Sequence, residues 1–216
     1  MKDFGLNRNV PLQKRQCALL FIDVQKYFAP RGGAHAHLPP AAAAAKYGYF
    51  FREMQQRAIP NMQRLQRDAR TAGVEVMYTI IQSLTQDGCD LSLDHKISRL
   101  FCPKGSRDAE VLDEIAPTDD ETVIPKTSSP VFVSTHIHYV LGNPGVKYLI
   151  IAGVLTDQCV DSAVRDACDP GYLGTRATDA CATVSPARQE SALANNRGYR
   201  RQLPTAAILG ERAAFA

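Results

Sequence analysis

The sequence predicts an α/β protein in which helices cover both faces of a parallel β-sheet. Short apolar runs of strand length alternate along the chain with segments of helical periodicity, which is typical of a parallel sheet. Two long connections, residues 29–40 and 82–107, follow apolar runs, and ligands bind at the carboxyl ends of the strands in such sheets. The length of 216 residues suits one domain with a substantial core.

Apolar runs bounded by polar, glycine or proline residues predict five strands, of which the fifth is the weakest, and a candidate sixth. In chain order they lie at residues 17–23, 74–81, 122–124, 148–152, 175–178 and 201–207. Because each is separated from the next by a connection long enough to cross over the sheet, parallel pairing is expected.

Helical periodicity lies between these strands. The longest helical stretch runs from about residue 42 to 72, is broken or kinked at Pro60, and ends at Gly73. Gly145 and Gly171 stand just after two other predicted helices, where glycine is favoured. The shorter helices are predicted at residues 109–115, 135–141, 159–168 and 186–196.

Composition and charge argue against several classes of protein. The net charge of +3 is small and the basic residues are scattered, so no nucleic-acid partner is indicated. No segment approaches the ~20 continuous apolar residues of a membrane span. Residues 1–16 form an extension without the apolar core of a secretory signal, with an organellar address as the alternative, and residues 17–216 are expected to be the folded domain. The six cysteines form no CxxC pair, which favours reduced thiols and a cytoplasmic location.

Cys159 is the first candidate for chemistry. It follows the apolar run at residues 149–153 and begins a helical pattern, so its thiol is expected among the free amides at the positive end of the helix dipole. This environment lowers a thiol pKa and favours the nucleophilic thiolate. The alternative is a small apolar residue packed where a strand meets a helix.

Two charged residues also stand at predicted strand ends. Asp23 closes the first strand, and Lys126 follows the third. Because the carboxyl ends of parallel strands meet along one edge of the sheet, both side chains are expected to approach Cys159. An acid, a cation and a thiol form the general pattern of covalent catalysis. Taken singly, each has an alternative: Asp23 as a helix cap and Lys126 as a surface lysine.

Three segments that carry these residues resemble the isochorismatase-like cysteine hydrolases. That family includes nicotinamidases, N-carbamoylsarcosine amidohydrolases, ureidoacrylate amidohydrolases and biuret hydrolases. The segments are Leu19-Leu-Phe-Ile-Asp-Val-Gln25, Pro125-Lys-Thr-Ser128 and Gly153-Val-Leu-Thr-Asp-Gln-Cys-Val160. The resemblance extends from about residue 17 to about residue 205, with the segments in the right order and spacing.

The resemblance implies a three-layer α/β/α, Rossmann-like fold with a six-stranded parallel sheet, and Asp23, Lys126 and Cys159 as a catalytic triad. It also implies a cis peptide bond between Val154 and Leu155, and an oxyanion hole formed by the amides of Leu155 and Cys159. The implied enzyme is a homo-oligomer, either a dimer or a tetramer, that needs no cofactor.

The implied reaction is metal-independent cleavage of a C–N bond in a small amide or ureide through a thioester acyl-enzyme. One alternative is isochorismatase-like hydrolysis of a vinyl ether, which proceeds without a thiol nucleophile. A second is a non-catalytic binding protein on the same fold. The presence of the complete triad argues against both alternatives.

Three residues near the triad are candidates for substrate recognition. Gln82 and Gln158 carry amides that both donate and accept hydrogen bonds, as recognition of an amide or ureide requires. Arg31 follows the first strand and is a candidate partner for a substrate carboxylate. Each also has the alternative of an ordinary loop residue.

A metal site is not expected. Metal-dependent nicotinamidases, which are similar to this chain, place Asp-x-His just after the second strand, where this chain has Gln82-Ser-Leu. His35 and His37 alternate in a way that suits chelation, but two residues fall short of a four-ligand site. A solvated or pocket-lining loop is expected there instead.

Overall fold

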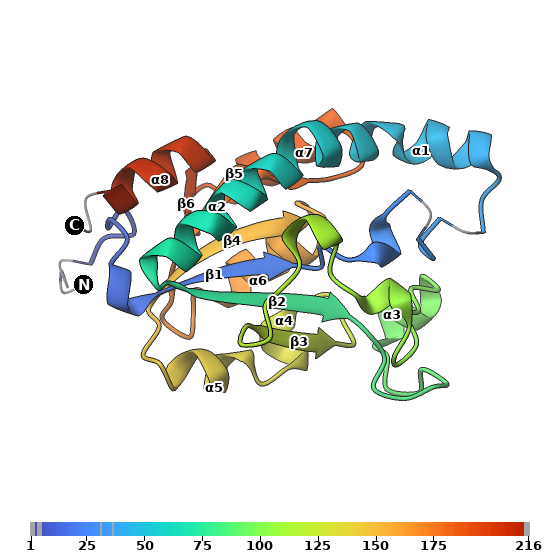
Figure 1. Cartoon of the computed structure of the whole chain (residues 1–216), viewed down its shortest axis with the longest axis horizontal. Coiled ribbons are helices and arrows are strands. Elements are labelled where there is room, and N and C mark those ends of the chain that lie inside the picture. The colour runs from blue at the N-terminus through green and yellow to red at the C-terminus, as the bar shows by residue number, and fades with distance from the viewer. Residues whose placement is uncertain (1–2, 4–5, 31, 36, 214–216) are drawn as a thin grey trace.

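In the computed structural model, which describes residues 3, 6–30, 32–35 and 37–213, six parallel strands form one sheet (Figure 1). Their spatial order is β3-β2-β1-β4-β5-β6, and helices cover both faces. The strands are β1 (Cys17–Ile22), β2 (Glu75–Ile81), β3 (Thr122–Lys126), β4 (Tyr148–Val154), β5 (Leu173–Ala182) and β6 (Arg201–Leu203). The predicted three-layer α/β fold is therefore confirmed.

The helices follow the predicted alternation in part, and those at residues 93–97, 131–134 and 205–213 were not predicted. The helices are α1 (Pro40–Glu53), α2 (Ile59–Ala72), α3 (Leu93–Ile97), α4 (Val131–Ser134), α5 (Ile137–Gly142), α6 (Cys159–Asp166), α7 (Pro186–Asn195) and α8 (Thr205–Ala213). The predicted helix at residues 109–115 is wrong, because the amide of Leu112 donates to the carbonyl of Val24 and only short 3-10 turns form on either side. The predicted strand end at residues 205–207 is also wrong, since these residues begin α8.

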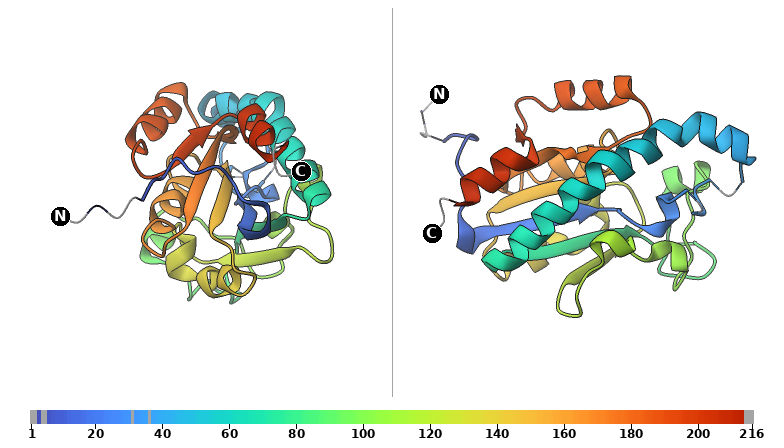
Figure 2. Two further views of the ribbon diagram at one scale, coloured as in Figure 1. Left: turned by 90° about the vertical axis from the view of Figure 1, so that its left-hand side faces the viewer. Right: turned by 45° about the horizontal axis from the view of Figure 1, so that its top comes forward.

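The predicted long helix is present, but its winding changes before Pro60. α1 passes into a π-helical turn, η3 (Met54–Ala58), and then into α2. Pro60 has no N–H to donate to a carbonyl one turn back, and the amide of Ile59 donates to the carbonyl of Met54, five residues earlier. The helical path continues without a break (Figure 2) and ends at Gly73, whose φ of 66° is left-handed.

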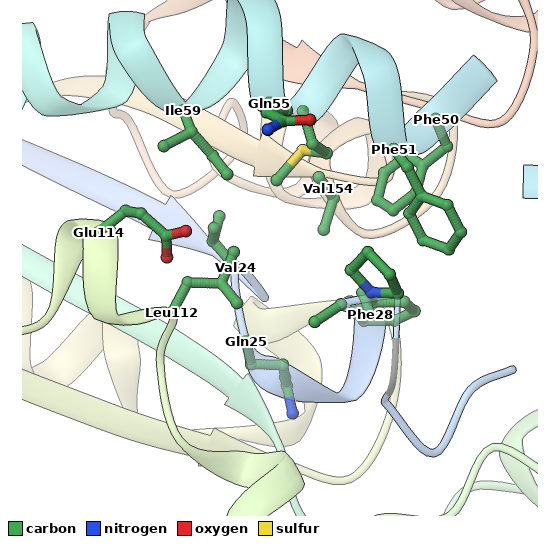
Figure 3. A pocket seen from close by; sticks show the side chains of 13 residues that line it. Val24, Gln25, Phe28, Phe50, Phe51, Gln55, Ile59, Leu112, Glu114 and Val154 are labelled. Carbon is green, nitrogen blue, oxygen red and sulfur yellow. The ribbon is translucent and has the colours of Figure 1, made fainter. Parts of the chain in front are cut away.

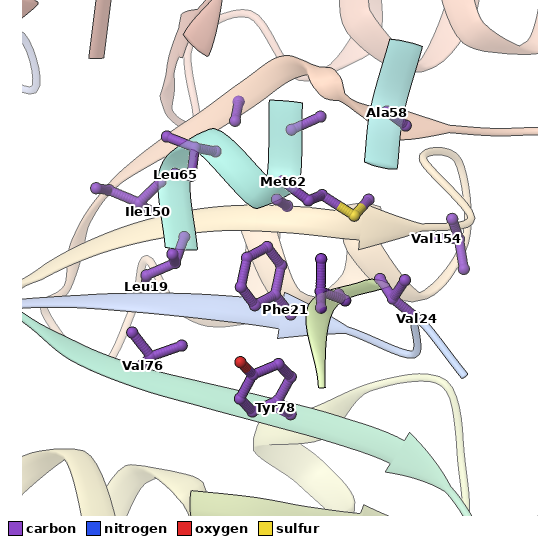
Figure 4. Packing of buried hydrophobic residues seen from close by; sticks show 14 of the residues in the cluster. Leu19, Phe21, Val24, Ala58, Met62, Leu65, Val76, Tyr78, Ile150 and Val154 are labelled. Carbon is purple, nitrogen blue, oxygen red and sulfur yellow. The ribbon is translucent and has the colours of Figure 1, made fainter. Parts of the chain in front are cut away.

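Side chains of the central strands alternate between the two faces of the sheet. Leu19 and Phe21 of β1 pack in one core with Met62 and Leu65 of α2 (Figure 4). The intervening side chains of β1 belong to a second core, which includes Val160 of α6. Every residue of β1 is buried, and full burial of a Leu or Phe side chain stabilises a fold by about 1.5–3 kcal/mol. The strand that leads to the candidate site is thus held from both faces.

From β1 the chain adds β2 and β3 toward one edge of the sheet, and from β4 it adds β5 and β6 toward the other edge, so the strand order switches direction between β1 and β4. In open parallel sheets this point opens a crevice at the carboxyl ends of the strands. β1 and β4 approach closely there because Gly153 has no side chain: a Cβ atom would lie 2.2 Å from the carbonyl oxygen of Ile22. The φ of Gly153, 135°, also favours glycine. The segments that follow Ile22 and Gly153 therefore emerge side by side.

Candidate active site

Three side chains meet at this edge of the sheet. Asp23 follows β1, Lys126 is the last residue of β3, and Cys159 is the first residue of α6. Lys126 Nζ lies 2.9 Å from Asp23 Oδ2 and 3.5 Å from Cys159 Sγ. Asp23 and Lys126 are fully buried, and Cys159 is 5% exposed. The fold thus brings together an acid, a cation and a thiol, with the cation in contact with both partners.

Thr79, a buried residue of β2, holds Asp23 in place. The backbone of Asp23 is left-handed, with a φ of 54°, a conformation that is uncommon for a residue with a Cβ atom. Its amide donates to the carbonyl of Thr79 at 3.0 Å, and its Oδ1 accepts from the hydroxyl of Thr79 at 2.8 Å. Thr79 was not among the predicted site residues, although a hydroxyl within an otherwise apolar strand is a signal that marks it.

The Lys126 ammonium has three contacts that keep it charged. Its Nζ donates to the carbonyl of Ser128 at 2.8 Å and also contacts Asp23 and Cys159. Burial lowers the pKa of Lys126, but its interactions with Asp23 and Cys159 raise it, and the net pKa lies above its ordinary value. Lys126 therefore carries a positive charge in the buried site at neutral pH.

Burial controls the protonation state of Cys159. Desolvation raises the pKa of the thiol to about 12; Lys126 opposes this rise, and Asp23 adds to it. The predicted lowering of this pKa by the helix dipole is therefore wrong, because a dipole effect of about 1 kcal/mol is smaller than the cost of burying a thiolate. The thiol is protonated at neutral pH, so a nucleophilic role requires a base, and Asp23 is the adjacent carboxylate.

The turn between β4 and α6 presents two free amides. The peptide bond between Val154 and Leu155 is cis. The carbonyl of Leu155 accepts hydrogen bonds from the amides of Gln158 and Val160, at 3.0 and 3.2 Å. In the part of the chain that the structure describes, no backbone carbonyl accepts from the amides of Leu155 or Cys159. Amides of this kind are available to bind an oxygen atom of a ligand.

Asp157 ties this turn to the neighbouring strand and helix. Its carboxylate accepts hydrogen bonds from the hydroxyl of Thr183 and from the guanidinium of Arg188 on α7. The amide of Thr156 donates to the carbonyl of Ala182, the last residue of β5, at 3.0 Å. Both side-chain and backbone contacts therefore fix the turn at the edge of the sheet.

Two pockets lie at this edge. The larger, of about 860 Å³, has Leu155 and Gln158 in its wall, and we call it the turn pocket. Aromatic side chains contribute much of the remaining wall: Tyr27, Phe28, Tyr47, Phe50 and Phe101. The smaller pocket, of about 260 Å³, lies between η3 and the ends of β1 and β4, and shares Phe28 and Phe50 with the turn pocket (Figure 3). Its wall is mostly apolar.

The residues predicted to recognise substrate take different positions. Gln158 is exposed and lines the turn pocket. Gln82 directly follows β2 and is half-buried, and its backbone N–H donates to the backbone carbonyl of Lys126 at 3.2 Å. Arg31 lies outside the described residues. Gln158 is thus the predicted recognition residue that the structure brings into the turn pocket.

The two histidines of the first long loop both line the turn pocket but differ in exposure. His35 is buried, with its ring centroid 4.1 Å from that of Tyr47, whereas His37 is exposed. Among the described residues, no group of three or more His, Cys, Asp or Glu side chains is arranged to hold a metal ion. None of the described helices is both long enough and apolar enough to cross a membrane.

The parallel sheet, with a buried acid, cation and thiol at its carboxyl edge, places the protein among the three-layer α/β/α proteins whose site lies at the strand ends. The family model described as "Isochorismatase domain" matches residues 17–207, and the chain belongs to the isochorismatase family. The predicted family is therefore confirmed.

Two similar sequences illustrate the range of this family. YddQ of Bacillus subtilis strain 168, described as an uncharacterized isochorismatase family protein, is 28% identical over 168 residues, which cover 78% of each chain. The ureidoacrylate amidohydrolase RutB of Rhizobium rhizogenes strain K84 is 26% identical over 199 residues, which cover 82% of this chain and 74% of that protein.

Solved structures share the fold. A cysteine hydrolase from Pseudomonas syringae pv. phaseolicola 1448A has a TM-score of 0.80 at 21% identity, covering 96% of this chain and 97% of that chain. A pyrazinamidase of Pyrococcus horikoshii in complex with zinc has a TM-score of 0.68 at 20% identity, covering 88% and 99%. At these identities the likeness concerns the fold.

Proposed function

We propose that this protein is a metal-independent cysteine hydrolase that cleaves a C–N bond of a small amide or ureide, with Asp23, Lys126 and Cys159 as its catalytic residues. The observation that carries the proposal is the position of Lys126 Nζ, 2.9 Å from Asp23 Oδ2 and 3.5 Å from Cys159 Sγ in a buried site. A nucleophile, a base and a group that orients them are the components of covalent catalysis. The similarity to a ureidoacrylate amidohydrolase supports the class of substrate.

In acylation, Asp23 accepts the thiol proton while the sulfur of Cys159 attacks the carbonyl carbon of the substrate. Because the pKa of this thiol is raised, the proton moves during the attack rather than before it. Lys126 stays charged and offsets the negative charge as it passes from the carboxylate to the sulfur. The amides of Leu155 and Cys159 donate to the oxyanion of the tetrahedral intermediate.

The intermediate then collapses with loss of the nitrogen. Asp23 returns the proton to the substrate nitrogen, the C–N bond breaks, and ammonia or an amine leaves a thioester on Cys159. In deacylation, Asp23 accepts a proton from water as the water oxygen attacks the thioester carbon. The C–S bond breaks, the sulfur regains a proton from Asp23, and the acid is released.

Metal independence is supported by the residues after β2. Gln82 and its neighbours stand where the metal-dependent nicotinamidases resembling this chain carry Asp-x-His. The mechanism needs no cofactor, because this chain's own side chains supply the base, the cation and the nucleophile. The homo-oligomer, either dimer or tetramer, the cytoplasmic location and the domain boundary at residue 17 stay predictions.

Ammonia release from a panel of ureides, biuret, carbamoyl amino acids and carboxamides tests the activity, and Cys159→Ser tests the nucleophile. We expect the variant to lose turnover by about a thousandfold or more with an unchanged melting temperature. Cys89→Ser, which alters an exposed thiol, is the matched control and should retain full activity. Near wild-type turnover in Cys159→Ser would refute the assignment of Cys159 as the nucleophile. Inhibition by EDTA would refute the proposal that the enzyme works without a metal.

A further inference from the structure

The turn pocket has charge of one sign. Its wall contains two basic residues of the lysine and arginine type: Lys46, on α1, and Arg99, two residues after the end of α3. None of the described residues that line this pocket is an aspartate or a glutamate. A concave surface with cations and no carboxylates has a positive potential, which favours a negatively charged group in a ligand.

Neither cation is engaged by a carboxylate of the described chain. The ammonium of Lys46 lies 5.2 Å from the ring centre of Tyr47. By contrast, Lys26, in the loop after β1, is paired with Glu110 at 2.6 Å and with Asp113 at 3.0 Å. The cations of the turn pocket therefore remain able to bind a carboxylate, and a guanidinium matches the geometry of that group.

The backbone at Arg99 points to the same role. Its φ of 55° is left-handed, directly after a turn in which the amide of Ser98 donates to the carbonyl of Asp94 and the amide of Leu100 donates to the carbonyl of His95. Glycine is the usual residue at such a helix end, and a side chain there lowers stability. The side chain that occupies this position lines the turn pocket, which gives a functional reason for an unfavourable residue.

We infer that the turn pocket selects amides or ureides that carry a carboxylate at the end remote from the scissile C–N bond, with Arg99 and Lys46 as the residues that bind it. This inference rests on the proposed function and specifies its substrate class. Leu155 and Gln158, from the turn before the nucleophile, line the same pocket as the two cations. A substrate whose carbonyl lies at the turn can therefore extend its other end toward Arg99 and Lys46.

Binding to the inactive Cys159→Ser protein separates this inference from the proposed function, because it needs no turnover. The probes are 3-ureidopropionate and its neutral analogue 3-ureidopropionamide, titrated by calorimetry at low ionic strength. We expect the carboxylate probe to bind at least fivefold more tightly. Adding Arg99→Gln should weaken binding of the carboxylate probe about tenfold, which is the effect of one charge-assisted hydrogen bond. The same substitution should change binding of the neutral probe less than twofold.

Two further variants test whether the guanidinium of Arg99, rather than the net charge or the backbone conformation, causes the preference for the carboxylate. Arg99→Gly relieves the backbone and removes the guanidinium, so we expect a higher melting temperature together with the same loss of preference for the carboxylate. Lys104→Gln makes the same change in net charge at an exposed residue of the same connection, away from the pocket wall, and should leave the preference intact.

Equal or tighter binding of the neutral probe, a preference for the carboxylate that survives both substitutions of Arg99, or no binding of either probe would each overturn the inference. Hydrolysis of the probes by the wild-type protein is measured separately. Loss of hydrolysis with the binding preference intact counts against the proposed chemistry and leaves the assignment of the carboxylate site in place.

Discussion

Replacing Asp23 by Asn is expected to make Cys159 more reactive toward an alkylating agent while turnover is lost. The negative charge of Asp23 raises the pKa of the thiol and also neutralises Lys126. Asn keeps the size of the side chain and an oxygen that can accept from the hydroxyl of Thr79. With the charge removed, the thiol 3.5 Å from Lys126 Nζ becomes the nearest group able to supply a counter-ion.

The distances between the charged groups set the size of the expected increase in thiolate. Two unit charges 2.9 Å apart interact by about 6 kcal/mol at an effective dielectric constant of ~20. Removing one partner of a buried ion pair costs about 3–5 kcal/mol, because the remaining charge is left uncompensated. Ionisation of Cys159 recovers part of this cost. A recovery of about 3 kcal/mol raises the thiolate fraction near pH 8 about a hundredfold, since a factor of ten corresponds to about 1.4 kcal/mol.

The assay is the rate of alkylation by iodoacetamide between pH 7 and 10, followed by mass spectrometry. A Cys89→Ser background removes an exposed thiol, and Cys159→Ser provides the blank. In the wild type, the thiol pKa of about 12 predicts slow alkylation that speeds up as the pH rises. For Asp23→Asn we expect faster alkylation throughout and no ammonia release, because the base is absent. An alkylation rate no higher than that of the wild type, in a variant shown to be folded by circular dichroism, would refute this electrostatic reasoning.

Two further predictions concern the positioning of the site. Thr79→Val removes the hydroxyl that donates to the base, so kcat should fall about tenfold, the effect of one hydrogen bond to a charged group, whereas Thr79→Ser should stay close to the wild type. Equal kcat values for the two variants would contradict this role. Gly153→Ala places a Cβ atom 2.2 Å from a β1 carbonyl, so the free energy of unfolding measured in urea should fall by about 3 kcal/mol or more. Gly48→Ala, in an open part of α1, should raise it by about 0.5–1 kcal/mol, and a similar effect of both changes would show that the β1–β4 approach is not tight.

Local patterns identified the central strands to within two residues. A strand of a parallel sheet that is buried on both faces is apolar along most of its length, so β1, β2 and β4 stand out from the chain. β5 was predicted too short because Gly174 and Asp179 bound the segment predicted at residues 175–178, whereas the strand runs on past both. The carboxylate of Asp179 accepts hydrogen bonds from the amide and the hydroxyl of Thr205, and this partner comes from a later element of the chain.

The candidate site, too, was predicted in part from local sequence patterns and in part only seen in the structure. Asp23, Lys126 and Cys159 could be named because polar residues at the ends of apolar strands converge at one edge of a parallel sheet. The residues that hold these three side chains in place could not be named from the sequence. Gln25 accepts from the amide of Ile81 and donates to its carbonyl, which clamps the loop after β1 to the end of β2. An isolated glutamine after a strand does not reveal a partner 56 residues away.

The sequence alone therefore determined the layered fold and the three side chains at its edge, because hydrophobic periodicity and strand-end chemistry are local properties. Only the tertiary structure decided the protonation of Cys159 and the one-sided charge of the turn pocket. A pKa depends on how much water the packed chain excludes and on charges brought from other strands, and a pocket wall is assembled from loops distant in sequence.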